Sequence, residues 1–463
     1  MSEPETNPHS AGGAVDDSPP PARTQLWGLR SATAIVIANM IGAGVFTTSG
    51  FSLASLDNRE HVLLAWLVAG TIALSGAIGY GALSRHITGS GGEYLFLSRA
   101  IHPLAGFLAG WISLVVGFTG AIAFAAMAFC DYALADDSFM PPKVIAAGLV
   151  LGFGLLHAMV RRGGVLIQDL IVFLKVGVLV IFVLIAIGRS GEWPGLAVQN
   201  PPSSAFAPWA FAATLVWISL SYSGFNAAVY IAGEVRNPQQ TVPRALLLGT
   251  AITTVFYVVL NAVFVYAPEP QVIAGNPEVA LFAAPVIAGE WFATIVRLVI
   301  CLALLSSVSS MIIAGPRVYA KMADDGVLPP ALRFRNGNAS FAILVQSVLA
   351  VIFILFTGLK DLLTYLSLVL SVSAALTVSC LFSPSLRRQG RTRGWERVAA
   401  GFFVMATLFL AGMSVVYHVG QARESGTWPR QLLAAGGTIV AGVICYYLAR
   451  RGSGIGGESQ LEA

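Results

Sequence analysis

Charged residues are scarce in this chain. Only 11% of its 463 residues are Asp, Glu, Lys or Arg, whereas 56% are hydrophobic. Because soluble proteins carry about 25% charged residues, this composition excludes an ordinary soluble domain. The apolar residues also gather in runs of roughly 20, the length that crosses about 30 Å of hydrocarbon as a helix. The sequence therefore predicts an all-α, multi-pass protein embedded in a lipid bilayer.

Cysteines and enzyme motifs are also few. Cys301, Cys380 and Cys445 fall inside apolar segments and Cys130 lies near the end of one, which indicates packing residues and not a disulfide framework. The sequence has no His, Asp or Glu cluster with metal-ligand spacing, no nucleophile elbow and no phosphate-binding loop. We therefore expect no enzymatic activity, no metal, no cofactor and no nucleic acid partner.

Both ends of the chain are polar, and we expect twelve membrane spans between them. Residues 1–24 are rich in Ser, Pro, Gly and acidic residues, which predicts a disordered tail and not a signal peptide. Residues 452–463 have the same character. The expected spans lie near Ser31–Leu56, Val62–His86, Leu104–Leu134, Val144–Met159, Val165–Ile187, Pro208–Val235, Leu246–Tyr266, Phe292–Lys321, Phe341–Thr357, Asp361–Phe382, Val398–His418 and Gln431–Leu448.

The positive charges give these spans an orientation. If both termini are cytoplasmic, nineteen Lys and Arg residues lie on or beside the inner connections and six on the outer ones. Lys and Arg accumulate on the cytoplasmic side of membrane proteins. The bias therefore predicts a protein of the cytoplasmic (inner) cell membrane with both tails in the cytoplasm.

A glycine-rich stretch interrupts the first apolar run. Residues Met40 to Phe46 read Met-Ile-Gly-Ala-Gly-Val-Phe, and each glycine weakens a helix by about 1 kcal/mol relative to alanine. A helix opened within hydrocarbon exposes amide and carbonyl groups, which is costly unless something polar occupies the gap. We therefore predict a broken helix that holds a small zwitterionic guest.

The sixth expected span carries a second interruption, Ser221-Tyr222-Ser223-Gly224-Phe225-Asn226. Gly44 and Gly224 lie 180 residues apart (224 − 44), about one unit of five helices. Because five is odd, the second unit enters the membrane with the opposite polarity. Broken helices at corresponding places in two inverted halves are typical of a transporter site. The alternative is close helix packing at small residues.

Four motifs in order over about 300 residues resemble those of the amino acid–polyamine–organocation (APC) permeases. They are Ile41-Gly42-Ala43-Gly44-Val45-Phe46, Gly91-Gly92-Glu93-Tyr94, Gly233-Glu234-Val235-Arg236-Asn237-Pro238 through Pro243, and Gly315-Pro316-Arg317-Val318-Tyr319 through Pro329. The resemblance implies a leucine-transporter-like fold with 12 transmembrane helices, and amino acid transport by alternating access. We place the first inverted repeat at 25–190, the second at 191–386 and two additional helices at 387–451.

The two breaks suit the two charges of an α-amino acid. The outer half-helix begins near Gly44 at its positive end, which favours a carboxylate, while carbonyls near Ile41 and Tyr222 suit an ammonium. Asn226 stands where many APC permeases carry glutamate, which favours neutral amino acids over arginine–agmatine exchange. The candidate substrate-binding residues are Ile41, Gly42, Ala43, Gly44, Tyr222, Ser223, Gly224, Phe225, Asn226, Ser113 and Met311.

Lys175 is the most informative single charge, because it lies within the fifth expected span. A lysine at mid-bilayer costs about 2.5–3.5 kcal/mol, so we expect partners inside the protein. The resemblance places its ammonium beside the first break and near hydroxyls of the eighth span, where it would take the place of Na⁺ and could exchange a proton. The candidate hydroxyls are Ser306, Ser307 and Ser310. The alternative is a fixed cation that ties helices together.

Two charges close the sixth span, and several functions stay open. Glu234 and Arg236 are candidates for an inner gate through Arg317 or Arg85, although an ordinary interfacial ion pair is an equal reading. The favoured function is a Na⁺-independent amino acid transporter, proton-coupled or exchanging. The alternatives are a polyamine or organic-cation permease, which the few acidic residues near the breaks disfavour, and a channel or transport-like receptor. The oligomeric state is not predicted.

Overall fold

The computed structural model describes residues 27–87, 89, 91–134, 140–159, 165–198, 206–333 and 339–452. The tail expected at 1–24 lies outside this part of the chain, as does all of the tail expected at 452–463 except Gly452. Within the described residues all regular structure is helical, apart from one β-bridge between Trp27 and Val235.

The helices follow the apolar runs of the sequence. The first half of the chain forms α1 Leu29–Met40, α2 Ala43–Leu56, α3 Arg59–His86, α4 Gly92–Ala100, α5 Pro103–Ile112, the π-helix η1 Ser113–Gly120, α6 Ala121–Ala133, α7 Pro142–Met159, α8 Val165–Gly188, η2 Ser190–Glu192, α9 Pro194–Ala197 and α10 Pro208–Tyr222. The second half forms α11 Ala227–Tyr230, η3 Ala232–Glu234, α12 Pro238–Tyr266, α13 Pro270–Ile273, α14 Val279–Ala288, α15 Glu290–Asp324, η4 Pro330–Leu332, α16 Ser340–Phe356, α17 Leu359–Ser379, η5 Cys380–Phe382, α18 Pro384–Arg388, α19 Gly394–Glu424 and α20 Arg430–Gly452.

Many of these helices can cross a membrane. Eight helical segments in the described part of the chain are long and apolar enough, and α1 with α2 makes a ninth if the bent pair counts as one span. The other three expected spans correspond to α8, to the interrupted pair α10 and α11, and to α16, which has 17 residues. A multi-pass helical membrane protein is therefore confirmed, while the number twelve stays a prediction.

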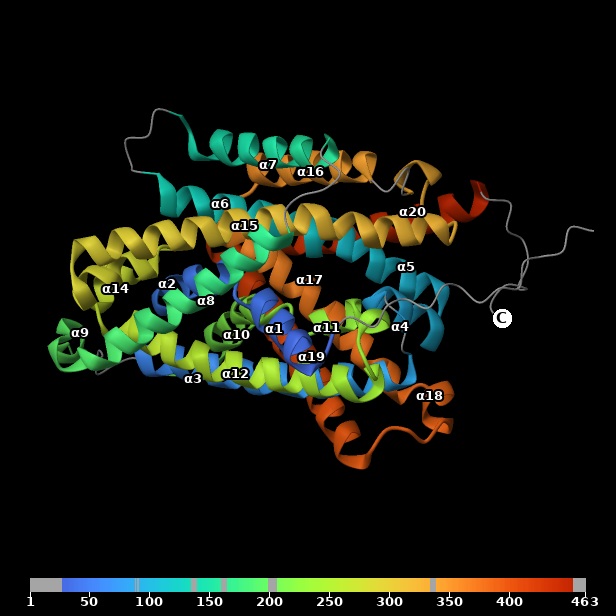
Figure 1. Cartoon of the computed structure of the whole chain (residues 1–463), viewed down its shortest axis with the longest axis horizontal. Helices are drawn as coiled ribbons and strands as arrows, with labels where there is room; N and C mark the ends of the chain where they lie inside the picture. The colour runs from blue at the N-terminus through green and yellow to red at the C-terminus, as the bar shows by residue number, and fades with distance from the viewer. Residues whose placement is uncertain are drawn as a thin grey trace, which may run out of the picture.

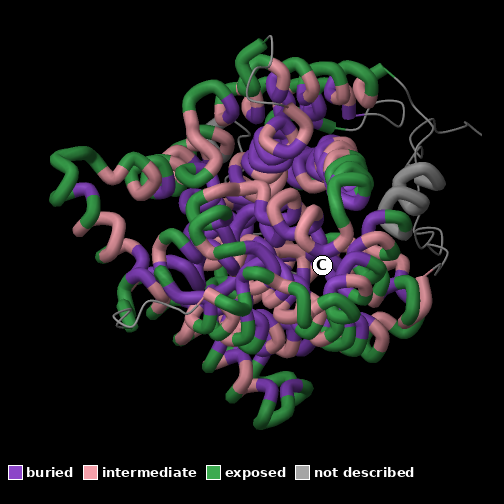
Figure 2. Tube along the Cα trace, turned by 90° about the vertical axis from the view of Figure 1, so that its left-hand side faces the viewer, coloured by how far each residue is buried: buried purple, intermediate pink, exposed green. Residues whose placement is uncertain are grey.

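The long helices run roughly side by side along the longest axis of the molecule (Figure 1). The central α15 packs against α6, α8 and α14, while α12 packs along α3 and α16 along α7. Buried residues fill the middle of the bundle and exposed ones its margin (Figure 2). On α19 the exposed side chains include Val398, Met405 and Phe409, with 73%, 70% and 65% of their surface uncovered. Such faces suit lipid tails, which are as apolar as leucine.

The two ends of the bundle differ. Helices α4, α11 and α18 gather at one end, whereas α9 and α14 lie at the other (Figure 1). Arg85 at the end of α3 and Arg387 and Arg388 on α18 belong to the first end, which we call the basic end. By the distribution of positive charge, the basic end is the one expected to face the cytoplasm.

Candidate functional site

The first span is broken where the glycines predict. Helix α1 ends at Met40, α2 begins at Ala43, and the two axes meet at an angle of 43°. Ile41 and Gly42 between them have non-helical backbone angles, with ψ of 88° at Ile41 and φ of −129° at Gly42. The last carbonyls of α1 and the first amides of α2 consequently have no partner within their own helices.

The second break lies between α10, which ends at Tyr222, and α11, which begins at Ala227. Gly224 has a φ of +97°, a conformation that side chains with a Cβ rarely adopt. The chain therefore leaves the α10 axis at the position that the Ser-Gly pair indicates, and Ser223 to Asn226 form a short non-helical link.

The two breaks touch each other, and their glycines permit the approach. A Cβ on Gly224 would lie 2.8 Å from the backbone oxygen of Asn39 in α1. A Cβ on Gly44 would lie 3.0 Å from the Cα of Ser221 in α10. The first distance is shorter than real Cβ atoms show and the second is tighter than nearly all of their contacts, and both involve backbone atoms of the opposite interrupted span. Glycine is therefore required at these positions by close packing of the two interrupted spans.

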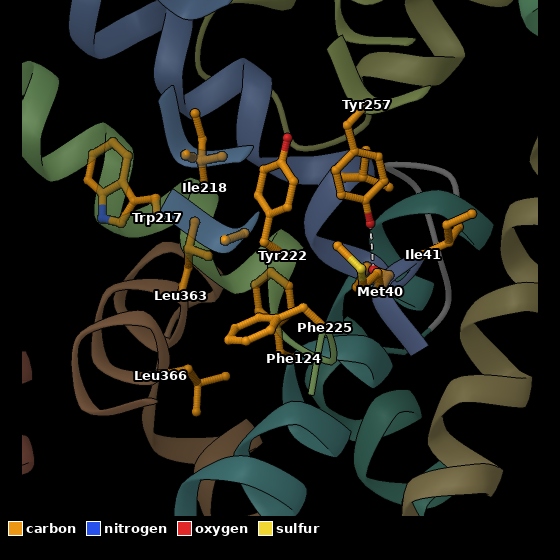
Figure 3. Close-up of a cluster of buried hydrophobic side chains, with 14 of the residues drawn as sticks. Met40, Ile41, Phe124, Trp217, Ile218, Tyr222, Phe225, Tyr257, Leu363 and Leu366 are labelled. Atoms are coloured by element: carbon orange, nitrogen blue, oxygen red, sulfur yellow. Dashed lines mark hydrogen bonds between the residues drawn. The ribbon is translucent and has the colours of Figure 1, made fainter. Parts of the chain in front are cut away.

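One tyrosine from a third helix serves both breaks. The hydroxyl of Tyr257 in α12 lies 2.5 Å from the carbonyl oxygen of Met40 and 3.1 Å from that of Ser221 (Figure 3). Its ring packs edge-on against Tyr222, with ring centroids 5.2 Å apart. Tyr257 thus satisfies carbonyls that the interrupted helices leave without partners. The sequence gives no signal for this role, because a tyrosine inside an apolar helix carries no distinctive pattern.

Lys175 lies beside the first break. Its ammonium donates to the carbonyl oxygens of Ile41 at 2.6 Å and Ala38 at 3.2 Å, and the residue is 4% exposed. The hydroxyls of the eighth span are engaged within their own helix: Ser307 donates to Ala303 and Ser310 to the backbone of Ser306. Among the described residues no hydrogen bond joins Lys175 to these serines. The lysine therefore holds the break through its carbonyls.

A cavity of about 630 Å³ lies next to the second break. Several candidate residues line it, namely Ser113, Met311, Tyr222, Ser223, Gly224, Phe225 and Asn226. The π-helix η1 supplies Ser113, Gly117 and Phe118, and such widened turns occur frequently at functional sites. Ile41, Gly42, Ala43 and Gly44 lie behind this wall and do not line the cavity. The structure thus brings the second break to the cavity and covers the first.

The cavity extends to residues at the basic end, where the gate candidates lie. Glu234 lines it together with Arg317 and Lys321. The indole of Trp27 donates to the Glu234 carboxylate at 3.4 Å, and the backbone of Trp27 pairs with that of Glu234 and Arg236. Arg85, one of the two partners considered for the gate, instead forms a 2.5 Å ion pair with Glu396 of α19.

Asn226 contacts a carboxylate, Glu93, whose role the residue pattern does not predict. Its side-chain amide donates to Glu93 Oε1 at 3.3 Å. Glu93 also accepts hydrogen bonds from the hydroxyls of Tyr80 and Ser373 and lines the cavity. The signal was present in Gly91-Gly92-Glu93-Tyr94, but one sequence could not show that this segment folds back against the sixth span.

The apolar bundle, its two interrupted spans and the cavity beside them define the class of this chain as a multi-pass helical membrane protein. Residues 28–444 match the amino acid permease family. The chain therefore belongs to this family, which confirms the resemblance to APC permeases.

Several curated transporters are similar to this chain. The human Large neutral amino acids transporter small subunit 2 is 27% identical over 341 residues, which cover 70% of this chain and 64% of the relative. The mouse b(0,+)-type amino acid transporter 1 is 25% identical over 73% of this chain and 72% of its own length. The human Asc-type amino acid transporter 1 is 25% identical over 78% of this chain and 71% of its own length. The alignment thus spans less than two thirds of the first relative.

Proposed function

We propose that this protein is a secondary transporter that carries amino acids, preferentially neutral ones, across the cytoplasmic membrane by alternating access. Family membership and the names of the three relatives support amino acid transport. The observation that carries the proposal is the contact between two broken spans at the edge of one cavity. A static anchor or a packing interface has no need of interrupted backbone in hydrocarbon.

The substrate's two charges are read by backbone groups. The first amides of α2, near Gly44, receive the carboxylate at the positive end of that helix once the first break is uncovered, because here Gly44 lies behind the cavity wall. Carbonyls near Tyr222 receive the ammonium, while the Ile41 carbonyl is bound by Lys175 in this structure. The substrate side chain then faces Phe225, Asn226, Ser113 and Met311, of which three are uncharged polar or sulfur-containing, so a neutral side chain fits best.

The proposed architecture is the leucine-transporter-like arrangement with both termini in the cytoplasm. Repeats at 25–190 and 191–386 each begin with a broken span, and the helices of 387–451 are appended. The exposed apolar face of α19 supports a peripheral place for those helices. In this arrangement we assign the structure to an inward-facing state, because the cavity extends to Glu234 and Arg317 at the basic end. Arg236 stays a gate candidate that does not line the cavity here.

Lys175 makes transport independent of Na⁺ in this proposal. Its ammonium occupies the position where a bound cation would hold the Ala38 and Ile41 carbonyls, at 3.2 and 2.6 Å. A covalently attached charge satisfies these oxygens permanently, so no dissolved cation is required. Ser306, Ser307 and Ser310 remain candidates for contact with Lys175 in another state of the cycle. The cycle is then driven by protons or by exchange.

Two measurements on the purified full-length protein test the proposal. A thermal-shift screen of the twenty amino acids should raise the melting temperature for a neutral subset, because a ligand that binds only the folded state stabilises it. Counterflow in proteoliposomes should then accumulate the labelled amino acid against an unlabelled internal pool. Conductance without counterflow would indicate a channel. A shift with spermidine but with no amino acid would indicate a polyamine permease.

A further inference from the structure

A buried carboxylate lies at the point where the second break meets the basic end. Glu93, in the first turn of α4, is 7% exposed and lines the cavity that Asn226 also lines. Its two carboxylate oxygens accept hydrogen bonds from side chains of three other segments. The donors are Tyr80 of α3, Asn226 of the second break at 3.3 Å and Ser373 of α17 at 3.3 Å. The carboxylate thus joins the second break to two neighbouring helices, α3 and α17.

The groups around Glu93 leave it without a positive partner. The titratable side chains that face it are Tyr80 from α3 and Tyr230 from α11, and Cys380 of η5 faces the backbone of Phe96 on α4. On α4 itself, Tyr94 turns away to donate to Asp325, and Arg99 is exposed. Glu234, Arg317 and Lys321 share the cavity wall, but no ion pair within the described residues includes Glu93.

A carboxylate in this setting has a proton as its natural ligand. Burial of an unpaired charge is costly, and such a group commonly neutralises itself by binding a proton. Burial raises the pKa of the Glu93 carboxyl, while the hydrogen bonds from Tyr80 and Ser373 oppose that rise. The raised pKa means that the proton is held at a higher pH than by an exposed glutamate.

Asn226 provides the connection to the substrate. Its amide stabilises the charged form of Glu93, so any movement of the second break that withdraws the amide strengthens proton binding. Linkage is reciprocal, so a proton on Glu93 must in turn favour the arrangement of the break in which the amide is withdrawn.

We infer that Glu93 is the proton-binding site of this transporter and that its proton moves inward with the amino acid. The inference rests on the proposed amino acid transport and decides between its two driving modes, in favour of proton symport. The geometry that carries it is the three-donor cradle on one unpaired, buried carboxylate at the cavity wall.

Proteoliposomes that contain the full-length protein and a trapped pH-sensitive dye test the inference. Labelled L-leucine and L-alanine serve as the probes, and the readout is the number of protons that enter per labelled amino acid. The wild-type protein should acidify the lumen, and Glu93→Gln should lower the proton-to-substrate ratio at least fivefold. Glu269→Gln, an isosteric change on an exposed loop, is the matched control and should keep the wild-type ratio.

The outcomes separate this inference from the proposed function. A wild-type ratio in Glu93→Gln, or wild-type counterflow without acidification, overturns the proton site and leaves amino acid transport standing. Absence of wild-type counterflow with every amino acid overturns the proposed function as well.

If Glu93→Gln does not fold or transports no amino acid, the variant Ser373→Ala tests whether Glu93 binds the transported proton. The loss of one donor to the charged form should shift the pH of half-maximal uptake upward by about 1 unit. An unchanged midpoint contradicts the inference.

Discussion

The ammonium of Lys175 lies 2.6 Å from the carbonyl oxygen of Ile41, the residue at which the first span is interrupted. A charge fixed on α8 therefore holds the backbone of the break between α1 and α2. This contact lies behind the cavity wall, so Lys175 shapes the site through the break and not by contact with the cavity.

Substitution of Lys175 should weaken substrate binding, because the carbonyls of the first break lose the charge that holds them. A hydrogen bond to a charged group contributes about 1.5–3 kcal/mol, so Lys175→Gln should weaken substrate binding roughly 10- to 100-fold. Titration by thermal shift measures this change. In the wild-type protein, uptake should be the same in sodium and in choline buffer, and uptake that disappears in choline would rule out the role assigned to the lysine.

Gly224→Ala should abolish uptake. The added methyl group would meet the Asn39 carbonyl at 2.8 Å, and the φ of +97° is strained for alanine. The two breaks must then separate, and the site loses its shape while the other helices persist. Counterflow and circular dichroism measure the two effects. Gly412→Ala on α19, where a Cβ meets nothing within 4 Å, is the control. Equal counterflow in both variants would contradict the argument.

Tyr257→Phe should lower stability modestly. The hydroxyl satisfies carbonyls at Met40 and Ser221, and a buried carbonyl that loses its only donor costs about 1–3 kcal/mol. The phenyl ring retains its packing, so the expected effect is a lower melting temperature in detergent with unchanged helix content. Tyr447→Phe on α20, a residue with 52% of its surface exposed, should leave the melting temperature unchanged. An equal effect in both would show that the hydroxyl contributes nothing.

Arg85→Met should be more harmful than the loss of a surface ion pair. The Glu396 side chain is 4% exposed, and its partner lies 2.5 Å away. Removal of one member of a fully buried pair costs about 3–5 kcal/mol, because the other charge stays buried. The expected cost here lies below that range, because Arg85 is 24% exposed and the backbone of Arg393 still donates to Glu396. Arg189→Met removes the exposed pair with Glu192 and should cost about 0–1 kcal/mol. Melting temperatures of the two variants in detergent provide the comparison, and similar values would refute it.

The sequence was sufficient to predict the two breaks but not what surrounds them. Paired glycines in an apolar run predict an interruption, because no other residue combines that flexibility with so small a volume. The membrane class follows from composition in the same way. Tyr257 and Glu93 were not predicted to contact the breaks, since their contacts join segments separated by as many as 280 residues. Such contacts depend on how helices pack, and a single sequence gives no measure of that.

For Lys175, too, the sequence predicts one contact correctly and leaves the others to helix packing. Its position within an apolar helix predicts an interior partner, and the Ile41 carbonyl is such a partner. The hydroxyls of Ser307 and Ser310 donate to backbone carbonyls one turn earlier in their own helix. Serine side chains in helices commonly form this local hydrogen bond. Side-chain rotation of this kind leaves no trace in residue spacing.

The π-helix η1 fixes the register of everything that follows it in the third span. A π-turn holds more residues than an α-turn, so a chain shortened by one residue between Ser113 and Gly120 could relax to ordinary α-geometry. The lost residue then offsets the extra residue of the widened turn, so α6 would still present the same side to α15 and α7. Each residue in an α-helix advances by about 100°, so a deletion just after η1, where no widened turn absorbs it, would turn buried alanines such as Ala123 and Ala126 away from their neighbours. The third span therefore tolerates a shorter chain within η1 but not within α6.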